Sequence, residues 1–181
     1  PNAVEEDDSL NPLLFLRQTT LTQADAALAD FADNFRAAQP RRDVLRALMI
    51  AVGDHVALAG GSFGGGDGSA AFAARQGTCH DQAHVLIACA RHLGVPARFV
   101  SGYIHNPARD HMASHAWAEL RCDGQWLTFD PAHRLDRPTT HLKLAIGMDY
   151  LDACPMRGVR VAGAGEQLSA RLVAQARQPN Q

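Results

Sequence analysis

The chain has 181 residues, of which 46% are hydrophobic and 20% charged, and a formal net charge of −2 at pH 7. These values are typical of one globular domain with a sizeable core. The balanced charge offers no basic surface for nucleic acid or anionic lipid. No uninterrupted apolar run approaches the ~18 residues that a membrane-spanning helix needs. We therefore expect neither a nucleic-acid partner nor a membrane span.

The first third of the chain predicts helices. Residues 1–19 contain an acidic run and two prolines, and we expect them to form an N-terminal arm ahead of a single core domain over residues 20–178. Apolar residues at helical spacing predict one helix that starts at a capping box on Thr22 and stops at Pro40, and a second helix capped by Asp43. A glycine-dense loop follows, and Ser69 can cap a short helix.

A cysteine stands in the first turn of the next predicted helix. Thr78 is a suitable N-cap, and Asp81 three residues later completes a capping box, so Cys79 takes the first helical position. Gly94 ends this helix. The first backbone N–H groups of a helix lack internal partners and carry a positive partial charge. We therefore expect the Cys79 thiol to have a pKa below its usual value.

The four cysteines do not suggest a metal site or a disulfide framework. They are widely spaced and include no CxxC pair. An even count would permit two disulfides, but Cys89 falls on the expected buried face of the cysteine helix, where a free thiol behaves as a small hydrophobe. We expect reduced thiols and a cytoplasmic protein.

Beyond the cysteine helix the hydrophobic period changes from helical to alternating. Strands are predicted over residues 97–104, 115–121 and 125–130, and shorter ones near 142–145, 157–162 and 167–176. Asp123-Gly124 is a strong signal for a tight hairpin turn between two of them. Helices followed by strands indicate the α+β class, with an antiparallel sheet packed against the cysteine helix.

The hairpin brings a histidine and an aspartate to one face of the sheet. If Cys122 pairs with Gln125, Asp130 lies one diagonal step from His115; if the turn shifts by one residue on each side, the two face each other directly. Both registers leave them on the same face. Cysteine, histidine and aspartate are the parts of a thiol hydrolase or acyltransferase. We expect Cys79 to be the nucleophile, His115 the general base and Asp130 the residue that orients the histidine.

Several motifs, in this order along the chain, resemble the bacterial transglutaminase-like family, whose members are often described as cysteine proteases. The resemblance covers roughly residues 20–176. The motifs are Gly-Thr-Cys-His-Asp-Gln-Ala-His (77–84), Gly-Val-Pro-Ala-Arg-Phe-Val-Ser-Gly-Tyr (94–103), Ser-His-Ala-Trp-Ala-Glu (114–119) and Trp-Leu-Thr-Phe-Asp-Pro (126–131).

The resemblance implies a papain-like transglutaminase-core fold, with the family's nucleophile, histidine and aspartate falling on Cys79, His115 and Asp130. His80 stands where the family usually has glutamine. Relatives commonly carry an N-terminal β-rich region, so we expect this chain to be a catalytic core alone. The implied reaction is hydrolysis of a peptide or amide bond in a peptide or protein substrate, with no cofactor; amine transfer to protein glutamine is the alternative.

Two other classes compete with an enzyme of this type. His80 and His84 lie four residues apart on one helical face and could supply two metal ligands, but no third is near in sequence, so we expect no metal. A degenerate core could instead serve as an inactive binding module. The presence of all three residues, Cys79, His115 and Asp130, favours the enzyme.

Overall fold

The computed structural model describes residues 10–60, 66–106 and 111–154. The strands predicted over 157–162 and 167–176, and most of the glycine-dense loop, lie outside these residues. In chain order the elements are η1 (Pro12–Leu16), α1 (Ala26–Asp33), α2 (Arg42–His55), β1 (Ala57–Leu58), α3 (Gly68–Ala74), β2 (Gln76–Gly77), α4 (Cys79–His92), β3 (Ala97–Asn106), β4 (His111–Cys122), β5 (Gln125–Phe129), β6 (His141–Gly147) and α5 (Tyr150–Ala153).

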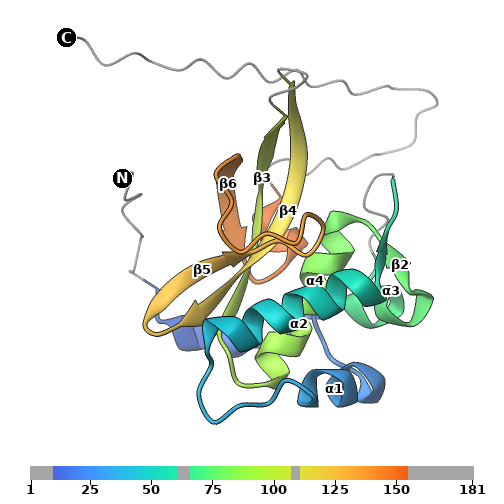
Figure 1. The fold of residues 1–181 in the computed structure, drawn as a ribbon, viewed down its shortest axis with the longest axis vertical. Coiled ribbons are helices and arrows are strands. Elements are labelled where there is room, and N and C mark those ends of the chain that lie inside the picture. Colours follow the sequence, from blue (N-terminus) through green and yellow to red (C-terminus); the bar gives the residue numbers. More distant parts are fainter. Residues whose placement is uncertain (1–9, 61–65, 107–110, 155–181) are drawn as a thin grey trace.

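The predicted antiparallel sheet is confirmed. It has four strands in the order β5-β4-β3-β6, with helices α1 to α4 gathered on one side of it (Figure 1). Cys122 pairs with Gln125, which is the first of the two expected registers. Asp123 and Gly124 both have positive φ, as the tight turn between β4 and β5 requires. The α+β assignment therefore holds for the described part of the chain.

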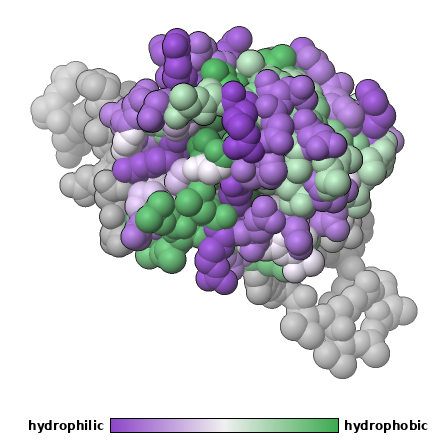
Figure 2. Space-filling model, turned by 90° about the horizontal axis from the view of Figure 1, so that it is seen from below, coloured by the Kyte–Doolittle hydropathy of each residue, from purple (hydrophilic) through white to green (hydrophobic). Residues whose placement is uncertain are grey.

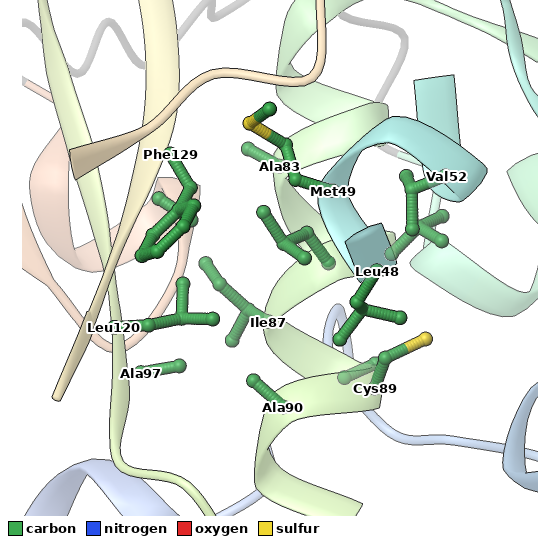
Figure 3. Packing of buried hydrophobic residues seen from close by; sticks show 14 of the residues in the cluster. Leu48, Met49, Val52, Ala83, Ile87, Cys89, Ala90, Ala97, Leu120 and Phe129 are labelled. Atoms are coloured by element: carbon green, nitrogen blue, oxygen red, sulfur yellow. The ribbon is translucent and has the colours of Figure 1, made fainter. Parts of the chain in front are cut away.

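Helix α4 lies in the middle of the core, between α2 and the sheet (Figure 3). Eleven of its fourteen residues are buried, and seven of these are apolar, so other segments cover nearly the whole circumference of the helix. Ile87 faces Leu120 and Phe129 of the sheet, while Leu48 and Val52 of α2 close the other side. Burial of this extent holds the helix, and the cysteine at its start, in one position relative to the sheet.

The helix starts differ in detail from the sequence prediction. Helix α1 begins at Ala26, capped by Asp25, because the side chain of Thr22 is engaged elsewhere: its hydroxyl accepts the backbone N–H of Thr19. Helix α2 begins at Arg42, so Asp43 lies in the first turn and does not cap it. A cap is a weak preference, worth about 1 kcal/mol, that other contacts of the same side chain readily override.

Arg91 of α4 joins segments from both ends of the chain. Its buried guanidinium donates to the carbonyl oxygens of Phe15 (2.9 Å), Ala97 (2.8 Å) and Met148 (2.7 Å), and to the hydroxyl of Thr22 (2.6 Å). Phe15 is itself buried, with its ring edge-on to Trp126 of β5 at 5.3 Å between centroids. Segment η1 is thereby attached to the core.

The described surface is ordinary for a globular domain. The face seen in Figure 2 is largely hydrophilic, with separate hydrophobic patches. Among the described residues, none of the helices combines the length and the apolar character needed to cross a bilayer. All four cysteines are free thiols, and Cys89 is buried as expected.

Candidate active site

The start of α4 forms as the sequence predicts. Asp81 N donates to the Thr78 hydroxyl at 3.4 Å, and Thr78 N donates to the Asp81 carboxylate at 2.7 Å, which completes the capping box. Gly77 allows this approach, because a Cβ there would lie 2.7 Å from the Cβ of Asp81. Cys79 is therefore the first residue of the helix.

The thiol of Cys79 is more buried than its place at a helix start suggests. Burial raises its pKa, and this effect outweighs the backbone N–H groups of Ala116, His80 and Cys79 itself, which lower it; the charge of Asp130 adds to the rise. The expectation of a lowered pKa is therefore wrong for the isolated thiol. Sequence shows the helix start but not the loss of water around the sulfur.

The predicted meeting of His115 and Asp130 is present. His115 Nε2 lies 2.8 Å from Asp130 Oδ2, and both side chains are buried. Asp130 follows β5 directly and bridges to Leu135, which fixes its backbone. With Nε2 engaged by the carboxylate, Nδ1 is the second nitrogen that the ring can offer to a thiol.

The Cys79 thiol lies against β4 beside this pair. Its backbone donor Ala116 is the residue that follows His115. Cys79 Sγ also lies 3.6 Å from His80 Nδ1, and no hydrogen bond joins Sγ to His115 in the described structure. Such contacts are often long in a ligand-free site and tighten when substrate binds. Sulfur, imidazole and carboxylate thus lie in one region of the structure. The sulfur and the ring of His115 must still move toward each other before a proton can pass between them.

Two further histidines, His133 and His141, bind the same carboxylate, and the sequence analysis missed both. His133 Nδ1 lies 2.9 Å from Asp130 Oδ2, and His141 Nε2 lies 2.8 Å from it. The other carboxylate oxygen accepts the backbone N–H groups of Ala132 and His133. Burial alone would raise the pKa of Asp130, but the hydrogen bonds from the three rings outweigh it and hold that pKa far below its usual range.

A partial signal for His133 was available in the sequence. It stands three residues after Asp130, at the spacing of an aspartate-capped turn. His141 was out of reach, because it arrives through the pairing of β6 with β3, opposite Ile104. Strand order between segments far apart in the sequence cannot be read from alternation.

The histidine pair weighed as metal ligands does not form a site by itself. His84 is buried, and its Nε2 accepts the backbone N–H of Tyr150 at 3.1 Å. Burial lowers the pKa of His84 to about 3. The metal-capable group among the described residues comprises four side chains, each with one ligand atom within 4.8 Å of the others: His115, Asp130, His133 and His141.

A second buried carboxylate on β4 has permanent cations as partners. Glu119 accepts the guanidinium of Arg98 at 2.6 Å and also pairs with the ammonium group of Lys143. Arg98 in turn stacks over the ring of Trp126, 4.2 Å from its centroid. The two cations and the aromatic ring make this cluster part of the sheet's packing.

Comparison with known proteins identifies the family. A family model described as the transglutaminase-like superfamily matches residues 29–131, which is more than half of the chain. An uncharacterised protein of Mycobacterium leprae (strain TN) is 34% identical over 91 residues, which cover 46% of this chain and 32% of that protein. The chain thus matches about a third of the length of this curated relative.

Two solved structures share the fold. The structure of a "Putative Cysteine Protease" from Cytophaga hutchinsonii aligns with a TM-score of 0.68 and 27% identity, over 85% of this chain and 52% of that one. The periplasmic domain of TgpA from Pseudomonas aeruginosa aligns with a TM-score of 0.51 and 27% identity, over 70% and 49%. The papain-like core expected from the motifs is thus confirmed, and the chain belongs to the transglutaminase-like superfamily.

Proposed function

We propose that this chain is a thiol-dependent acyl-transfer enzyme that hydrolyses peptide or amide bonds in a peptide or protein substrate. The observation that carries the proposal is the 2.8 Å hydrogen bond between His115 and Asp130. The next residue along β4, Ala116, directs its backbone N–H at the thiol of Cys79. Membership of the superfamily and the likeness to the Cytophaga protein support the same chemistry.

In the first half of the reaction, His115 Nδ1 takes the proton of the Cys79 thiol, and the thiolate attacks the substrate carbonyl. The carbonyl π electrons move to oxygen, where the backbone N–H of Cys79 is the natural donor to the oxyanion. The intermediate collapses to a thioester as the imidazolium of His115 gives its proton to the leaving amine. Asp130 stabilises the charged ring throughout.

In the second half, His115 acts as a base toward a water molecule. The water attacks the thioester carbonyl, and the tetrahedral intermediate expels the thiolate of Cys79, which regains its proton from the imidazolium. The products are a carboxylic acid and the free enzyme. If an amine replaces water in this step, the same residues complete an amide transfer, which is the alternative outcome.

The experiment is activity-based profiling against a peptide library, with Cys79→Ala beside the parent. We expect cleavage by the parent and none by the variant. His115→Ala should also abolish turnover, and a near-parental rate in that variant would show that the base is misplaced. Adding a glutamine peptide and an amine probe separates the two outcomes: an adduct of amine mass indicates transfer, whereas cleavage or deamidation indicates hydrolysis.

Alkylation tests the remaining alternative, an inactive binding module. Because burial raises the pKa of the isolated Cys79 thiol, rapid labelling by iodoacetamide at pH 6 requires proton transfer to His115. We expect stoichiometric labelling of Cys79 at pH 6 that is lost in His115→Ala. Cys89 is the internal control, since burial raises its pKa to about 12. Labelling that is equally slow in both proteins would favour the binding module.

A further inference from the structure

The carboxylate of Asp130 is the meeting point of three imidazole rings from three parts of the fold. His115 comes from β4, His133 from the turn after β5, and His141 from the start of β6. Each presents one nitrogen 2.8–2.9 Å from the same oxygen, Oδ2. An ionised carboxylate can only accept hydrogen bonds, so each of these nitrogens must carry its proton. The carboxylate thereby fixes the tautomer of every neutral ring around it.

We propose that His133 and His141 are positioning residues, whose N–H groups hold the Asp130 carboxylate in the orientation that keeps His115 in its Nε2–H form. The Nδ1 lone pair of His115 is then the atom that receives the proton of Cys79. The inference rests on the proposed function, since it concerns the same imidazole. Neither His133 nor His141 needs to contact the substrate in this role.

The surroundings of His141 place a ring proton on Nε2. The side chain is 3% exposed, and Nδ1 is buried with no hydrogen-bond partner among the described residues. A second proton, on Nδ1, would leave a buried N–H without an acceptor among the described residues. The ring of Trp117 lies 4.9 Å from that of His141, centroid to centroid, and Trp117 Nε1 is a buried donor that also has no partner among the described residues.

Hydrogen bonds from the backbone fix the orientation of the Asp130 carboxylate. Asp130 Oδ1 is held by the N–H groups of Ala132 and His133 at 3.0 and 3.3 Å, so the carboxylate is tied at one oxygen to its own turn. Rotation about the side chain would break these bonds and would also move Oδ2 away from His115. The N–H groups of His133 and His141 oppose that rotation from two further directions. Five donors therefore define one orientation of the carboxylate.

The same side chains invite comparison with a metal site. Zinc binds histidine nitrogens at about 2.0–2.1 Å, whereas here a carboxylate oxygen occupies the space between the three nitrogens at ordinary hydrogen-bond lengths. An ion would have to enter between that oxygen and the three nitrogens and take the place of the proton that each ring directs at the oxygen. Hydrogen bonding requires neither change, so the geometry favours it. Metal binding becomes an outcome of the test.

The test uses variants that keep or remove one donor. A glutamine amide nitrogen can take the place of Nε2, and an asparagine amide nitrogen that of Nδ1. Thus His141→Gln and His133→Asn retain the donor, while His141→Leu and His133→Ala remove it. The matched control is His92→Ala, which removes an imidazole hydrogen-bonded to a carboxylate (Asp33, 2.9 Å) at the exposed end of α4.

Two measurements are made on each protein at pH 7: the ¹⁵N chemical shifts of the histidine rings, which report tautomers, and the rate of Cys79 alkylation by iodoacetamide. In the parent we expect Nε2–H at His115 and His141 and Nδ1–H at His133. Removing one donor should mix the tautomers of His115 and slow alkylation about tenfold, the effect of one hydrogen bond to a charged group. The donor-retaining variants should stay within about twofold of the parent, and His92→Ala should be unchanged.

Three results would overturn the proposal. The first is an Nδ1–H tautomer at His115 in the parent. The second is equal behaviour of donor-removing and donor-retaining variants; if His141→Leu does not fold, the deciding pair is His141→Gln and His141→Asn, whose shorter side chain cannot reach Asp130. The third is stoichiometric Zn²⁺ binding that shifts the ¹⁵N signals of His115, His133 and His141 together. Failure of the proposed function would give a different result. The variant Cys79→Ala would still turn over substrate, while the histidine tautomers would remain as this proposal expects.

Discussion

Two buried carboxylates on the same sheet are stabilised in opposite ways. Glu119, near the end of β4, has a guanidinium and an ammonium group as partners. Asp130, at the end of β5, has three imidazoles and two backbone N–H groups. The partners of Glu119 keep their charge throughout the physiological range, whereas imidazoles gain or lose a proton within it.

This difference separates a structural site from a chemically responsive one. A carboxylate between permanent cations can hold strands together, but it has no partner that can exchange a proton near neutral pH. A carboxylate among imidazoles can stabilise a ring as it becomes charged, which is what a proton-transfer site needs. We therefore expect substitutions at the two carboxylates to have separable effects: activity at Asp130 and stability at Glu119.

The largest expected effect is on activity at Asp130. Asp130→Ala should lower turnover by roughly 10²–10⁴-fold and leave a measurable trace, because the thiol and imidazole remain while the orientation of His115 is lost. Glu119→Gln is the comparison, and its folded fraction should turn over substrate at close to the parental rate. Steady-state kinetics on the same peptide substrate measure both. A large activity loss in folded Glu119→Gln would break the distinction.

The next effect is on stability at Glu119. Glu119→Gln leaves Arg98 and Lys143 without their common anion, and removal of one partner from a buried ion pair costs about 3–5 kcal/mol. Lys143 is one-third exposed, so the lower end of that range is expected. Urea unfolding at pH 7 gives the free energy directly. A change below about 1 kcal/mol would mean that water already solvates these charged groups in the folded protein.

A third buried ionisable side chain, His84, sharpens the comparison because it is buried without charge. Its folded-state pKa is about 3, below the unfolded value near 6.5. Between these values the unfolded chain binds a proton that the folded protein excludes, so stability falls as the pH is lowered through that range. By pH 4 the loss is on the order of 3 kcal/mol.

The matched variant for this pH dependence is His84→Gln. Its side-chain oxygen can still accept the N–H of Tyr150, but it cannot titrate. Urea unfolding at pH 7 and pH 4 should therefore show a smaller difference in the variant than in the parent. An unchanged difference would assign the acid sensitivity between pH 7 and pH 4 to other groups. Asp130 is not one of them, because its lowered pKa makes its own contribution fade only below about pH 4.

The smallest expected effect concerns the exposed counterpart of the Asp130 cluster. His92 and Asp33 form an imidazole–carboxylate hydrogen bond of 2.9 Å at the surface. Because water screens this pair, His92→Ala should change neither turnover nor the urea midpoint measurably. A clear shift in either quantity would show that a histidine–aspartate contact matters in this protein regardless of burial.

The sequence predicted the parts of the site that depend on local rules. The capping box placed Cys79 at the start of its helix, and alternation about Asp123-Gly124 placed His115 and Asp130 on one face. It could not predict the raised pKa of the thiol, which depends on burial by distant segments. Nor could it predict His141, since the neighbour of β3 is decided by how the sheet is assembled.

The anchoring of η1 by Arg91 determines where a truncated version of this protein should begin. A shortened chain that begins at Thr20, where the core was expected to start, would lose the Phe15 carbonyl that the guanidinium binds and the ring that covers Trp126. The first loss acts on the far end of the helix that carries Cys79, and the second acts on β5. Trimmed versions meant for enzymology should therefore retain the residues from Leu10 onward.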